Sequence, residues 1–348
     1  MRVAVAGWLE GTEHSGANRR LSGLLNAIGP LLREGESVTL IHGPGPRPEV
    51  PSPIHTRQVD IPAHPLVSRW WRQRKLLPAL LRQLDATVLD QGFLPVPTNL
   101  PCALSLTIHD LRDLGGYARR AKWLARLGLW SGLRRADAVI APSRFTQDQL
   151  KAAFGKIVPK RAVVIPNGVD PRFANTRPHL ADPAYLLHVG HLEPRKNLTL
   201  LLQAWSLLEE RGRAPRLILA GADRGCGEDL RRAAGKRVEL VGPVHEERLL
   251  DLYAGCTAVL VPSAYEGFGL PALEALAVGK PVLVSDAGAL PEVVGEQGIV
   301  LPVDDPAAWA DAIESIEVGG EEPRRRHAAR YTWEDAARQT LELWRELS

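Results

Sequence analysis

The sequence predicts an α/β protein with two Rossmann-like, doubly wound domains that face each other across a cleft. Three observations lead to this prediction. Short β-rich apolar runs alternate with helical stretches along the chain, the series of strands restarts near residue 185, and 348 residues suffice for two domains. The 45% apolar and 24% charged fractions are typical of a folded protein and exclude wholesale disorder.

The first series of strands starts at the N-terminus. Residues 2–6 predict a strand that ends at Gly7, residues 17–33 recur apolar at helical spacing, and residues 37–41 predict a second strand. Further buried strands are predicted at residues 86–89, 102–107 and 138–141. The Pro-rich residues 43–53 indicate a surface loop rather than a linker between domains.

The second series of strands fills the other half of the chain. These strands are predicted at residues 185–189, 216–220, 238–241, 258–261 and 281–284. The joint between the series lies in residues 166–184, which are rich in Pro, Asn, Asp and Gly. We therefore expect a first domain over residues 1–172, a second over 173–330, and a terminal helix over 331–348 capped by Thr332. Ligands of open α/β sheets bind beyond the carboxyl ends of the strands, so the cleft is the expected site.

The cysteines and the N-terminus indicate a reducing, cytoplasmic setting. Cys102, Cys226 and Cys256 are odd in number and far apart, which argues against a disulfide framework and a zinc ribbon. The N-terminus lacks the charged and apolar regions of a secretory signal. No apolar run approaches the roughly 18 residues of a membrane-spanning helix.

The net charge of +3 hides two oppositely charged halves. Residues 1–175 carry 24 basic and 13 acidic side chains, whereas residues 176–348 carry 19 and 27. Residues 67–84 and 115–135 together hold 11 Lys or Arg, no acid and four of the nine Trp. Such stretches suit interfacial helices on anionic headgroups. The alternative is a pair of helices with Trp and Leu in the core and Arg in water. Nucleic-acid binding is disfavoured because no known module is present.

The first chemical motif is Pro-Ser-Ala-Tyr-Glu-Gly-Phe-Gly-Leu-Pro-Ala-Leu-Glu at residues 262–274. It follows a predicted strand and opens a helix, which places Glu266 above the helix N-terminus and Glu274 one turn inside it. Both carboxylates could accept hydrogen bonds from sugar hydroxyls. Because Gly267 and Gly269 have no side chains, their backbone N–H groups could approach an anion. The alternative is a plain strand-to-helix turn with a glutamate placed for the helix dipole.

The second motif is Gly-His-Leu-Glu-Pro-Arg-Lys-Asn at residues 190–197. It follows a strand and precedes an amphipathic helix, which Asn197 is placed to cap. Arg195 can make bidentate contacts and Lys196 acts as a compact charge, so the pair suits a diphosphate. The alternative is a solvated pair of cations. No Asp-x-Asp occurs in the chain, which favours neutralisation of a diphosphate by these cations over a divalent metal.

The first half contributes two weaker candidates. Gly16 lies in a glycine loop at residues 11–17, where it would open a helix, although an ordinary strand-to-helix turn explains the loop equally well. The loop is not G-x-G-x-x-G, which counts against a dinucleotide oxidoreductase. His109 follows a buried strand and is expected at its carboxyl end. The remaining histidines are less favoured: His14, His188, His191 and His245, of which His188 is expected to be packed.

Together these motifs resemble those of the retaining glycosyltransferases of family 4, which have the GT-B fold. The resemblance rests on the Glu266–Glu274 pair with seven residues between them, on the Gly190 to Asn197 stretch and on supporting motifs. The supporting motifs are at residues 141–146, 165–170, 290–295 and 331–334.

The resemblance implies a role for each candidate residue. Glu266 would contact hydroxyls of the donor sugar, Glu274 would contact the ribose, and His109 would hydrogen-bond the sugar near the reacting carbon. Arg195 and Lys196 would hold the diphosphate, and Gly16 would open a helix towards it. The donor-binding residues would also include Gly190, Gly267, Phe268, Gly269 and Leu270. The terminal helix would cross back to pack on the first domain.

The implied activity is transfer of a hexose from a nucleoside diphosphate to a hydroxyl of a saccharide or lipid-linked acceptor, with retention and without a metal or other cofactor. The residue 188–205 stretch resembles bacterial mannosyltransferases, so GDP-mannose is the first expected donor and UDP-glucose the second. The expected location is the cytoplasm, peripheral to the inner leaflet. Two alternatives remain open: a nucleotide-sugar epimerase, and a non-catalytic binder of sugar nucleotides on the same fold.

Overall fold

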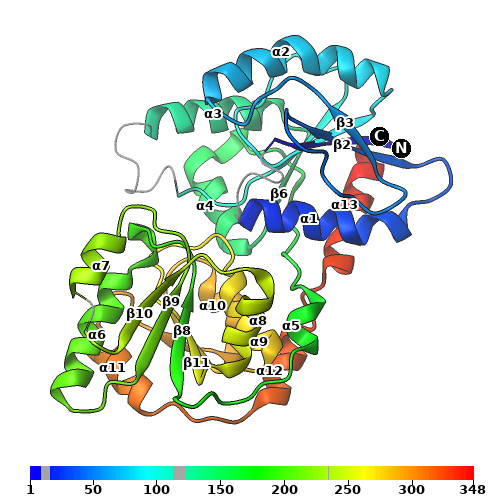
Figure 1. The fold of residues 1–348 in the computed structure, drawn as a ribbon. Helices are drawn as coiled ribbons and strands as arrows, with labels where there is room; N and C mark the ends of the chain where they lie inside the picture. Colours follow the sequence, from blue (N-terminus) through cyan, green and yellow to red (C-terminus); the bar gives the residue numbers. More distant parts are fainter. Residues whose placement is uncertain (9–15, 113–121, 234) are drawn as a thin grey trace. The chain divides into compact units, whose positions relative to one another are not determined.

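The computed structural model describes residues 1–8, 16–112, 122–233 and 235–348, shown in Figure 1. The chain divides into two compact units. Unit 1 consists of Met1–Gly168 and Thr332–Ser348, and unit 2 consists of Val169–Tyr331. The chain therefore crosses between units close to the expected boundaries at residues 172 and 330.

Unit 1 is built on a parallel sheet whose described strands run in the order β3-β2-β1-β4-β5-β6-β7. These strands are β1 (Arg2–Gly7), β2 (Ser37–His42), β3 (His55–Gln58), β4 (Val88–Gln91), β5 (Ala103–Thr107), β6 (Ala138–Ala141) and β7 (Ala162–Val164). Val3 of β1 is in register with Val38 of β2 on one side and Val88 of β4 on the other. The strand order reverses at β1 and β4, which makes their carboxyl ends the switch point of the sheet.

Helices cover both faces of this sheet because alternate strand residues point to opposite sides. The described helices are α1 (Gly16–Ile28), α2 (Leu66–Gln83), α3 (Lys122–Arg135), α4 (Arg144–Phe154) and α13 (Trp333–Leu347), with 3₁₀ turns η1 (Gly29–Leu31) and η2 (Gly155–Ile157). α1 and α13 share a hydrophobic core with Val3 and Val5. α2, α3 and α4 pack in the other core, with Ala4 and Ala6. α2 and α3 therefore cover the same face of the sheet.

The terminal helix α13 packs on α1 within unit 1, as Figure 1 shows. A Cβ on Gly23 of α1 would lie 2.3 Å from the Trp333 ring, so a glycine is needed for this contact. Thr332 caps the helix as predicted, and its side chain accepts a hydrogen bond from the Asp335 N–H at 3.0 Å. Trp344, near the other end, donates to Asp90 of β4 at 3.2 Å.

Unit 2 repeats the doubly wound design, with strands in the order β10-β9-β8-β11-β12-β13. The strands are β8 (Tyr185–Val189), β9 (Arg216–Ala220), β10 (Val238–Gly242), β11 (Ala258–Val261), β12 (Val282–Ser285) and β13 (Ile299–Leu301). Here the order reverses between β8 and β11, and Leu187 is in register with Val259. The loops that follow these two strands therefore leave the sheet side by side.

The helices of unit 2 lie on the two faces of this sheet (Figure 1). They are α5 (Pro171–Asn175), α6 (Leu198–Glu210), α7 (Gly227–Ala233), α8 (Glu246–Gly255), α9 (Leu270–Val278), α10 (Leu290–Val294), α11 (Pro306–Glu314) and α12 (Glu321–Ala328), with 3₁₀ turns η3 (Pro194–Lys196) and η4 (Gly295–Gln297). α6 and α11 share a core with Leu186, and α8 and α9 share the other with Leu187.

The structure confirms the predicted fold class and corrects two details. The side-chain cap expected at Asn197 is wrong, because Asn197 has a left-handed backbone (φ 53°) and its amide donates to the Val303 carbonyl at 2.8 Å. The strand expected at residues 86–89 is β4, displaced by two residues. Among the helices of the described residues, none has both the length and the hydropathy needed to cross a bilayer.

Two helices of unit 1 expose large apolar side chains. On α2, Val67 and Trp71 are 71% and 65% exposed, while Arg69 and Gln73 on the inner side are buried. On α3, Trp123 is 62% exposed. The alternative, in which the Trp side chains of these helices face the core, therefore does not hold for Trp71 and Trp123.

Candidate active site

The structure brings the two sequence motifs of unit 2 together at the carboxyl ends of β8 and β11. The β8 loop carries Arg195 and Lys196 on η3, and the β11 loop carries Glu266 ahead of α9. The loops are joined through their backbones, since the Ala264 N–H donates to the Arg195 carbonyl at 2.8 Å. Residues about 70 positions apart thus form one site, because β8 and β11 are neighbours in the sheet.

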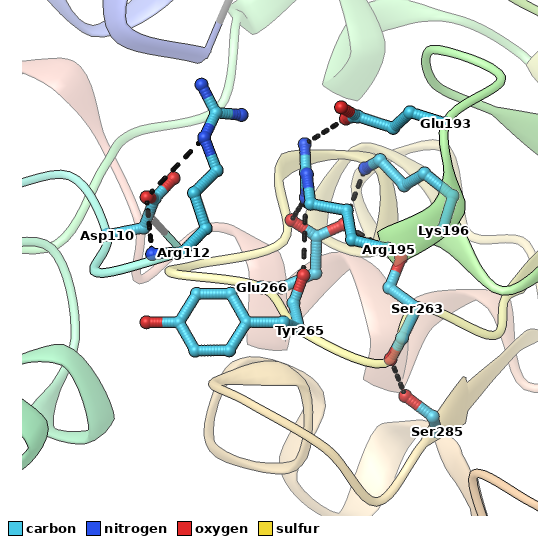
Figure 2. A network of polar contacts seen from close by, with 9 residues as sticks. All are labelled: Asp110, Arg112, Glu193, Arg195, Lys196, Ser263, Tyr265, Glu266 and Ser285. Carbon is cyan, nitrogen blue, oxygen red and sulfur yellow. Dashed lines mark hydrogen bonds and ion pairs between the residues drawn. The ribbon is translucent and has the colours of Figure 1, made fainter. Parts of the chain in front are cut away.

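Glu266 lies at the centre of a polar cluster, drawn in Figure 2. Its Oε1 accepts hydrogen bonds from Lys196 Nζ at 2.5 Å and from Ser263 Oγ at 2.8 Å. Its Oε2 accepts from Arg195 Nη1 at 3.1 Å. Arg195 also contacts Glu193, with 2.7 Å between Nη2 and Oε1. We call Glu193, Arg195, Lys196, Ser263 and Glu266 the Glu266 cluster.

Two opposing effects set the ionisation of Glu266. Burial of the carboxylate disfavours its charge, but the Lys196 and Arg195 cations and the hydrogen bonds from Lys196 and Ser263 more than offset this. The pKa of Glu266 is consequently lowered to about 2. A carboxylate that stays ionised at neutral pH is a hydrogen-bond acceptor and not a proton donor.

The hydrogen bond by which Ser263 supports Glu266 was not predicted from the sequence. Ser263 stands in the first motif but carried no assigned role, and Ser285 lies at the end of β12. Ser285 Oγ donates to the Ser263 carbonyl at 2.5 Å, and both serines are fully buried (Figure 2). β12 therefore supports the loop that holds Glu266.

Glycines allow backbone segments to approach the cluster closely. A Cβ on Gly288, which has φ +69°, would lie 2.6 Å from the Glu266 N and O atoms. A Cβ on Gly221 would lie 1.9 Å from the Gly190 carbonyl. Gly221 and Gly288 follow β9 and β12 as Gly190 follows β8, and this common position after a strand is the signal that would have identified them.

The α9 N-terminus combines a glycine turn with buried side chains. Gly269 has φ +107° and precedes the helix. Phe268 and Leu270 pack in the core of unit 2, and the Phe268 ring lies 6.0 Å from the Tyr331 ring. Only the backbone from Gly267 to Leu270 is therefore suited to contact a ligand.

Glu274 is buried one turn inside α9. Its Oε2 accepts a hydrogen bond from the Tyr253 hydroxyl of α8 at 2.7 Å. Tyr253 itself is fully buried and stacks edge-on with Phe173. The sequence predicted the position of Glu274 on the helix but not this partner.

The two candidate residues of unit 1, His109 and Gly16, lie in different segments of that unit. His109 is partly buried, and its Nε2 lies 2.8 Å from where a Cβ on Gly92 would stand. Burial and, to a smaller extent, the Arg20 and Arg112 cations lower the pKa of His109 to about 3, so its ring is neutral. Gly16 is the first residue of α1. His14 and the rest of the glycine loop up to Ser15 lie outside the described residues.

Buried Arg20 links α1 to one of the motifs behind the family resemblance. Its Nη1 donates to the Ile165 carbonyl at 2.9 Å and to Asn167 Oδ1 at 2.7 Å.

The less favoured His245 caps α8 by accepting from the Arg248 N–H at 3.3 Å. Within the described parts of the chain, no group of three or more His, Cys, Asp or Glu side chains is placed to hold a metal ion.

Solved structures first define the class of fold. The chain superposes on sucrose-phosphate synthase from Thermosynechococcus elongatus with a TM-score of 0.84 and 21% identity, covering 99% of this chain and 98% of that one. It superposes on WaaG, a glycosyltransferase involved in lipopolysaccharide biosynthesis, with a TM-score of 0.74 and 16% identity, covering 98% and 99%. The fold is GT-B.

Family models then identify the family. Residues 16–173 match the model "Glycosyltransferase Family 4" and residues 183–317 match "Glycosyl transferases group 1". The chain belongs to the family-4 glycosyltransferases.

Curated relatives match part of the chain. An O-antigen chain mannosyltransferase B of Escherichia coli is 40% identical over 182 residues, 48% of this chain and 47% of the relative. A D-inositol 3-phosphate glycosyltransferase of Corynebacterium urealyticum is 33% identical over 234 residues, which are 61% of this chain and 55% of the relative. A GDP-mannose-dependent alpha-(1-6)-phosphatidylinositol dimannoside mannosyltransferase of Mycobacterium tuberculosis is 31% identical over 219 residues, 59% and 56%. The matches span about half the length of these relatives.

Proposed function

We propose that the protein transfers a hexosyl group from a nucleoside diphosphate to a hydroxyl of a saccharide or lipid-linked saccharide. The observation that supports this most is the Glu266 cluster, in which two cations and an ionised carboxylate meet at the carboxyl ends of neighbouring strands. Cations suit a diphosphate and an ionised carboxylate suits sugar hydroxyls. Family membership supports the same activity.

Each residue has an assigned role in this proposal. Arg195 and Lys196 neutralise the diphosphate, and Glu266 accepts hydrogen bonds from donor-sugar hydroxyls. Glu274 accepts from the ribose, which requires its carboxylate to share or exchange the bond from Tyr253. The backbone of Gly190 and of Gly267–Leu270 approaches the phosphates. In unit 1, we assign His109 to the donor sugar and Gly16 to the diphosphate.

We further propose that transfer retains the anomeric configuration by same-face attack. The bond from the sugar carbon to the phosphate oxygen breaks, the bond to the acceptor oxygen forms, and the acceptor proton passes to the leaving phosphate. Glu266 suits this route as a binding group, because both its oxygens already accept bonds from cations or Ser263. Trapping a glycosyl adduct on a carboxylate would overturn the route.

The cations also favour a reaction that needs no metal or other cofactor. One guanidinium and one ammonium group, both within 3.1 Å of the Glu266 carboxylate, provide positive charge of the kind that a leaving diphosphate requires. We expect the wild-type rate to be unchanged by EDTA and by added Mg²⁺. A loss of activity in EDTA that Mg²⁺ restores would contradict this expectation.

GDP-mannose is the donor we propose, with UDP-glucose as the second candidate. Two of the relatives above are named as mannosyltransferases, one of them GDP-mannose-dependent. A thermal-shift series with GDP, GDP-mannose, UDP and UDP-glucose tests the choice. A ligand at ten times its Kd raises stability by about 1.4 kcal/mol, which is measurable. Absence of a shift with GDP would rule out the mannose assignment.

The epimerase and binder alternatives predict different products. An epimerase converts the donor sugar without any acceptor, whereas a binder shows a thermal shift but neither transfers nor hydrolyses any donor. Product analysis of each donor, with and without a lipid-linked or free saccharide, separates the three. Lys196→Ala and Glu266→Ala then remove transfer in the enzyme we propose.

We propose that α2 and α3 contact an anionic membrane, which would bring a lipid-linked acceptor near. Both helices cover one face of the unit 1 sheet. Trp123, Leu127 and Trp130 lie on α3 at i, i+4 and i+7 spacing and are 62%, 53% and 40% exposed. The Arg134 guanidinium stacks over the Trp130 ring at 4.8 Å. Exposed aromatic groups beside cations suit a headgroup region, and the cytoplasmic leaflet supplies anionic lipids.

The polarity of α2 supports the same proposal. In its N-terminal half, the usual placement of apolar side chains inside and charged side chains outside is reversed. Arg69 is buried and donates to the Ala63 carbonyl at 3.2 Å, while Leu66, Val67 and Trp71 are exposed. A helix in contact with water alone does not favour this arrangement.

Co-sedimentation with vesicles tests the membrane contact. Vesicles of phosphatidylcholine with phosphatidylglycerol should bind the protein at low salt and release it at high salt, and Trp71→Ser with Trp123→Ser should weaken binding. The control is Leu180→Ser with Val318→Ser, which alters two apolar side chains of unit 2 that are 54% and 56% exposed. Absence of binding at low salt, or an equal loss in the control, would refute the proposal.

A further inference from the structure

His188 of β8 is a buried histidine whose hydrogen bonding is half complete. Its side chain is fully buried, and Nδ1 lies 2.9 Å from the Leu260 carbonyl of β11. A carbonyl only accepts, so Nδ1 carries the proton and Nε2 presents a lone pair. Among the described residues, Nε2 has no hydrogen-bond partner. Such a buried unpaired acceptor in a native structure calls for an explanation.

The ring is held neutral by its surroundings. Burial is the larger cause and the Lys196 cation the second, and together they lower the pKa of His188 to about 4. The Nε2 lone pair is therefore available to a donor at neutral pH.

The unpaired Nε2 and the Lys196 ammonium both lie next to Gly190. A Cβ placed on Gly190 would stand 3.5 Å from His188 Nε2 and 3.3 Å from Lys196 Nζ. Gly190 has no Cβ, so no side chain separates the two nitrogens at this point. Lys196 is also the cation whose charge acts on the His188 ring.

Lys196 needs a second acceptor in the reaction proposed above. Within the described part of the chain its ammonium has one hydrogen-bond partner, Glu266, and it is 95% buried. When the ammonium turns to a diphosphate and Glu266 turns to sugar hydroxyls, that bond is given up. A buried ammonium with unpaired N–H groups is unfavourable, so an acceptor that remains in place matters most at that moment.

We propose that His188 is a positioning residue, whose Nε2 accepts a hydrogen bond from Lys196 and keeps the ammonium directed at the diphosphate. This inference rests on the proposed function, since it names a new member of the same site. His188 touches neither the sugar nor the acceptor. Its effect reaches the diphosphate through Lys196 alone.

Two substitutions separate the two ring nitrogens. His188→Asn keeps a donor near Nδ1 and removes the Nε2 acceptor, whereas His188→Gln keeps an acceptor near Nε2 and removes the donor. GDP and GMP are the probes, with UDP and UMP in parallel, because only the diphosphates carry the second phosphate. Calorimetry gives the affinities, and thermal unfolding of each unliganded variant shows that it folds.

We expect His188→Asn to weaken GDP binding by about tenfold to a hundredfold, the range typical of one hydrogen bond to a charged group, with little effect on GMP. His188→Gln should recover most of that loss. In a Lys196→Met background, His188→Asn should add little, because the two residues act as a unit. Equal losses in both His188 variants, equal losses for GDP and GMP, or an undiminished effect in the Lys196→Met background would overturn the inference.

The wild-type protein distinguishes this inference from the proposed function. If it binds neither diphosphate, the proposed function fails and the inference fails with it. If it binds and transfers but His188→Asn retains its GDP affinity, the positioning role alone is wrong.

Discussion

Glu266→Gln removes one charge from the Glu266 cluster and leaves the side chain nearly the same size. The wild-type carboxylate has its pKa lowered from 4.5 to about 2 and is 8% exposed. At 1.36 kcal/mol per pKa unit, that difference contributes on the order of 3 kcal/mol to the free energy of unfolding at pH 7. The glutamine variant lacks this contribution and leaves Arg195 and Lys196 facing a neutral group.

The sign of the pH dependence follows from the direction of the shift. A carboxylate with a lowered folded-state pKa stabilises the protein above its unfolded pKa, near 4.5, and loses that contribution as the pH falls toward 2. At pH 3 about 1.4 kcal/mol of the contribution remains. The stability difference between wild type and Glu266→Gln should therefore shrink by about 2 kcal/mol between pH 7 and pH 3.

Urea unfolding at both pH values measures this difference. Trp205 and Trp309 are fully buried in unit 2, so their fluorescence reports on the unit that holds Glu266. Glu322→Gln, which changes a carboxylate whose side chain is 73% exposed on α12, is the matched control and should show no such change. A difference between wild type and Glu266→Gln that stays constant from pH 7 to pH 3 would refute the electrostatic account of the cluster.

Three further predictions concern the supports of the site. Gly288→Ala should destabilise unit 2 by about 1–3 kcal/mol in urea unfolding, because a Cβ would lie 2.6 Å from Glu266 backbone atoms at a φ of +69°; an unchanged midpoint would contradict this. Tyr253→Phe should cost about 1–3 kcal/mol of stability, since it deprives the buried Glu274 carboxylate of a 2.7 Å hydrogen bond; a shift of the thermal midpoint checks it. Ser263→Ala should raise the KM for the donor by about tenfold, because Glu266 loses a 2.8 Å donor that orients it; steady-state kinetics would show an equal KM if the serine only fills space.

The sequence predicts the interior strands better than the edge strands, for a physical reason. Strands buried on both faces, such as β6 and β11, consist of continuous apolar runs. β3 at the sheet edge reads His-Thr-Arg-Gln and is largely exposed, so its residues carry no apolar signal. The sequence places the β4 strand two residues too early because β4 ends in Asp90 and Gln91, which are buried yet polar. Asp90 is satisfied by Ser105 at 2.6 Å and by Trp344 from the far end of the chain.

The site shows a similar division. Its charged residues were identified because local motifs place them at helix N-termini. The contact between these charged residues was not predicted, because it depends on β11 lying beside β8 although two strands intervene in the sequence. Ser285 and Gly288 were missed for the same reason, since they come from β12 and the segment after it and reach Glu266 only through the sheet.

The Glu266 cluster is electrically balanced before any ligand arrives. Arg195 and Lys196 carry two positive charges, and Glu193 and Glu266 carry two negative ones. In the function we propose, a diphosphate brings further negative charge, so it competes with Glu266 for the cations rather than filling a positive pocket. Glu266 released in this way is a buried carboxylate that needs new donors, and the hydroxyls of a sugar attached to the same diphosphate are suited to supply them. In the function we propose, the arrangement therefore couples recognition of the sugar to neutralisation of the phosphates, which neither motif would do alone.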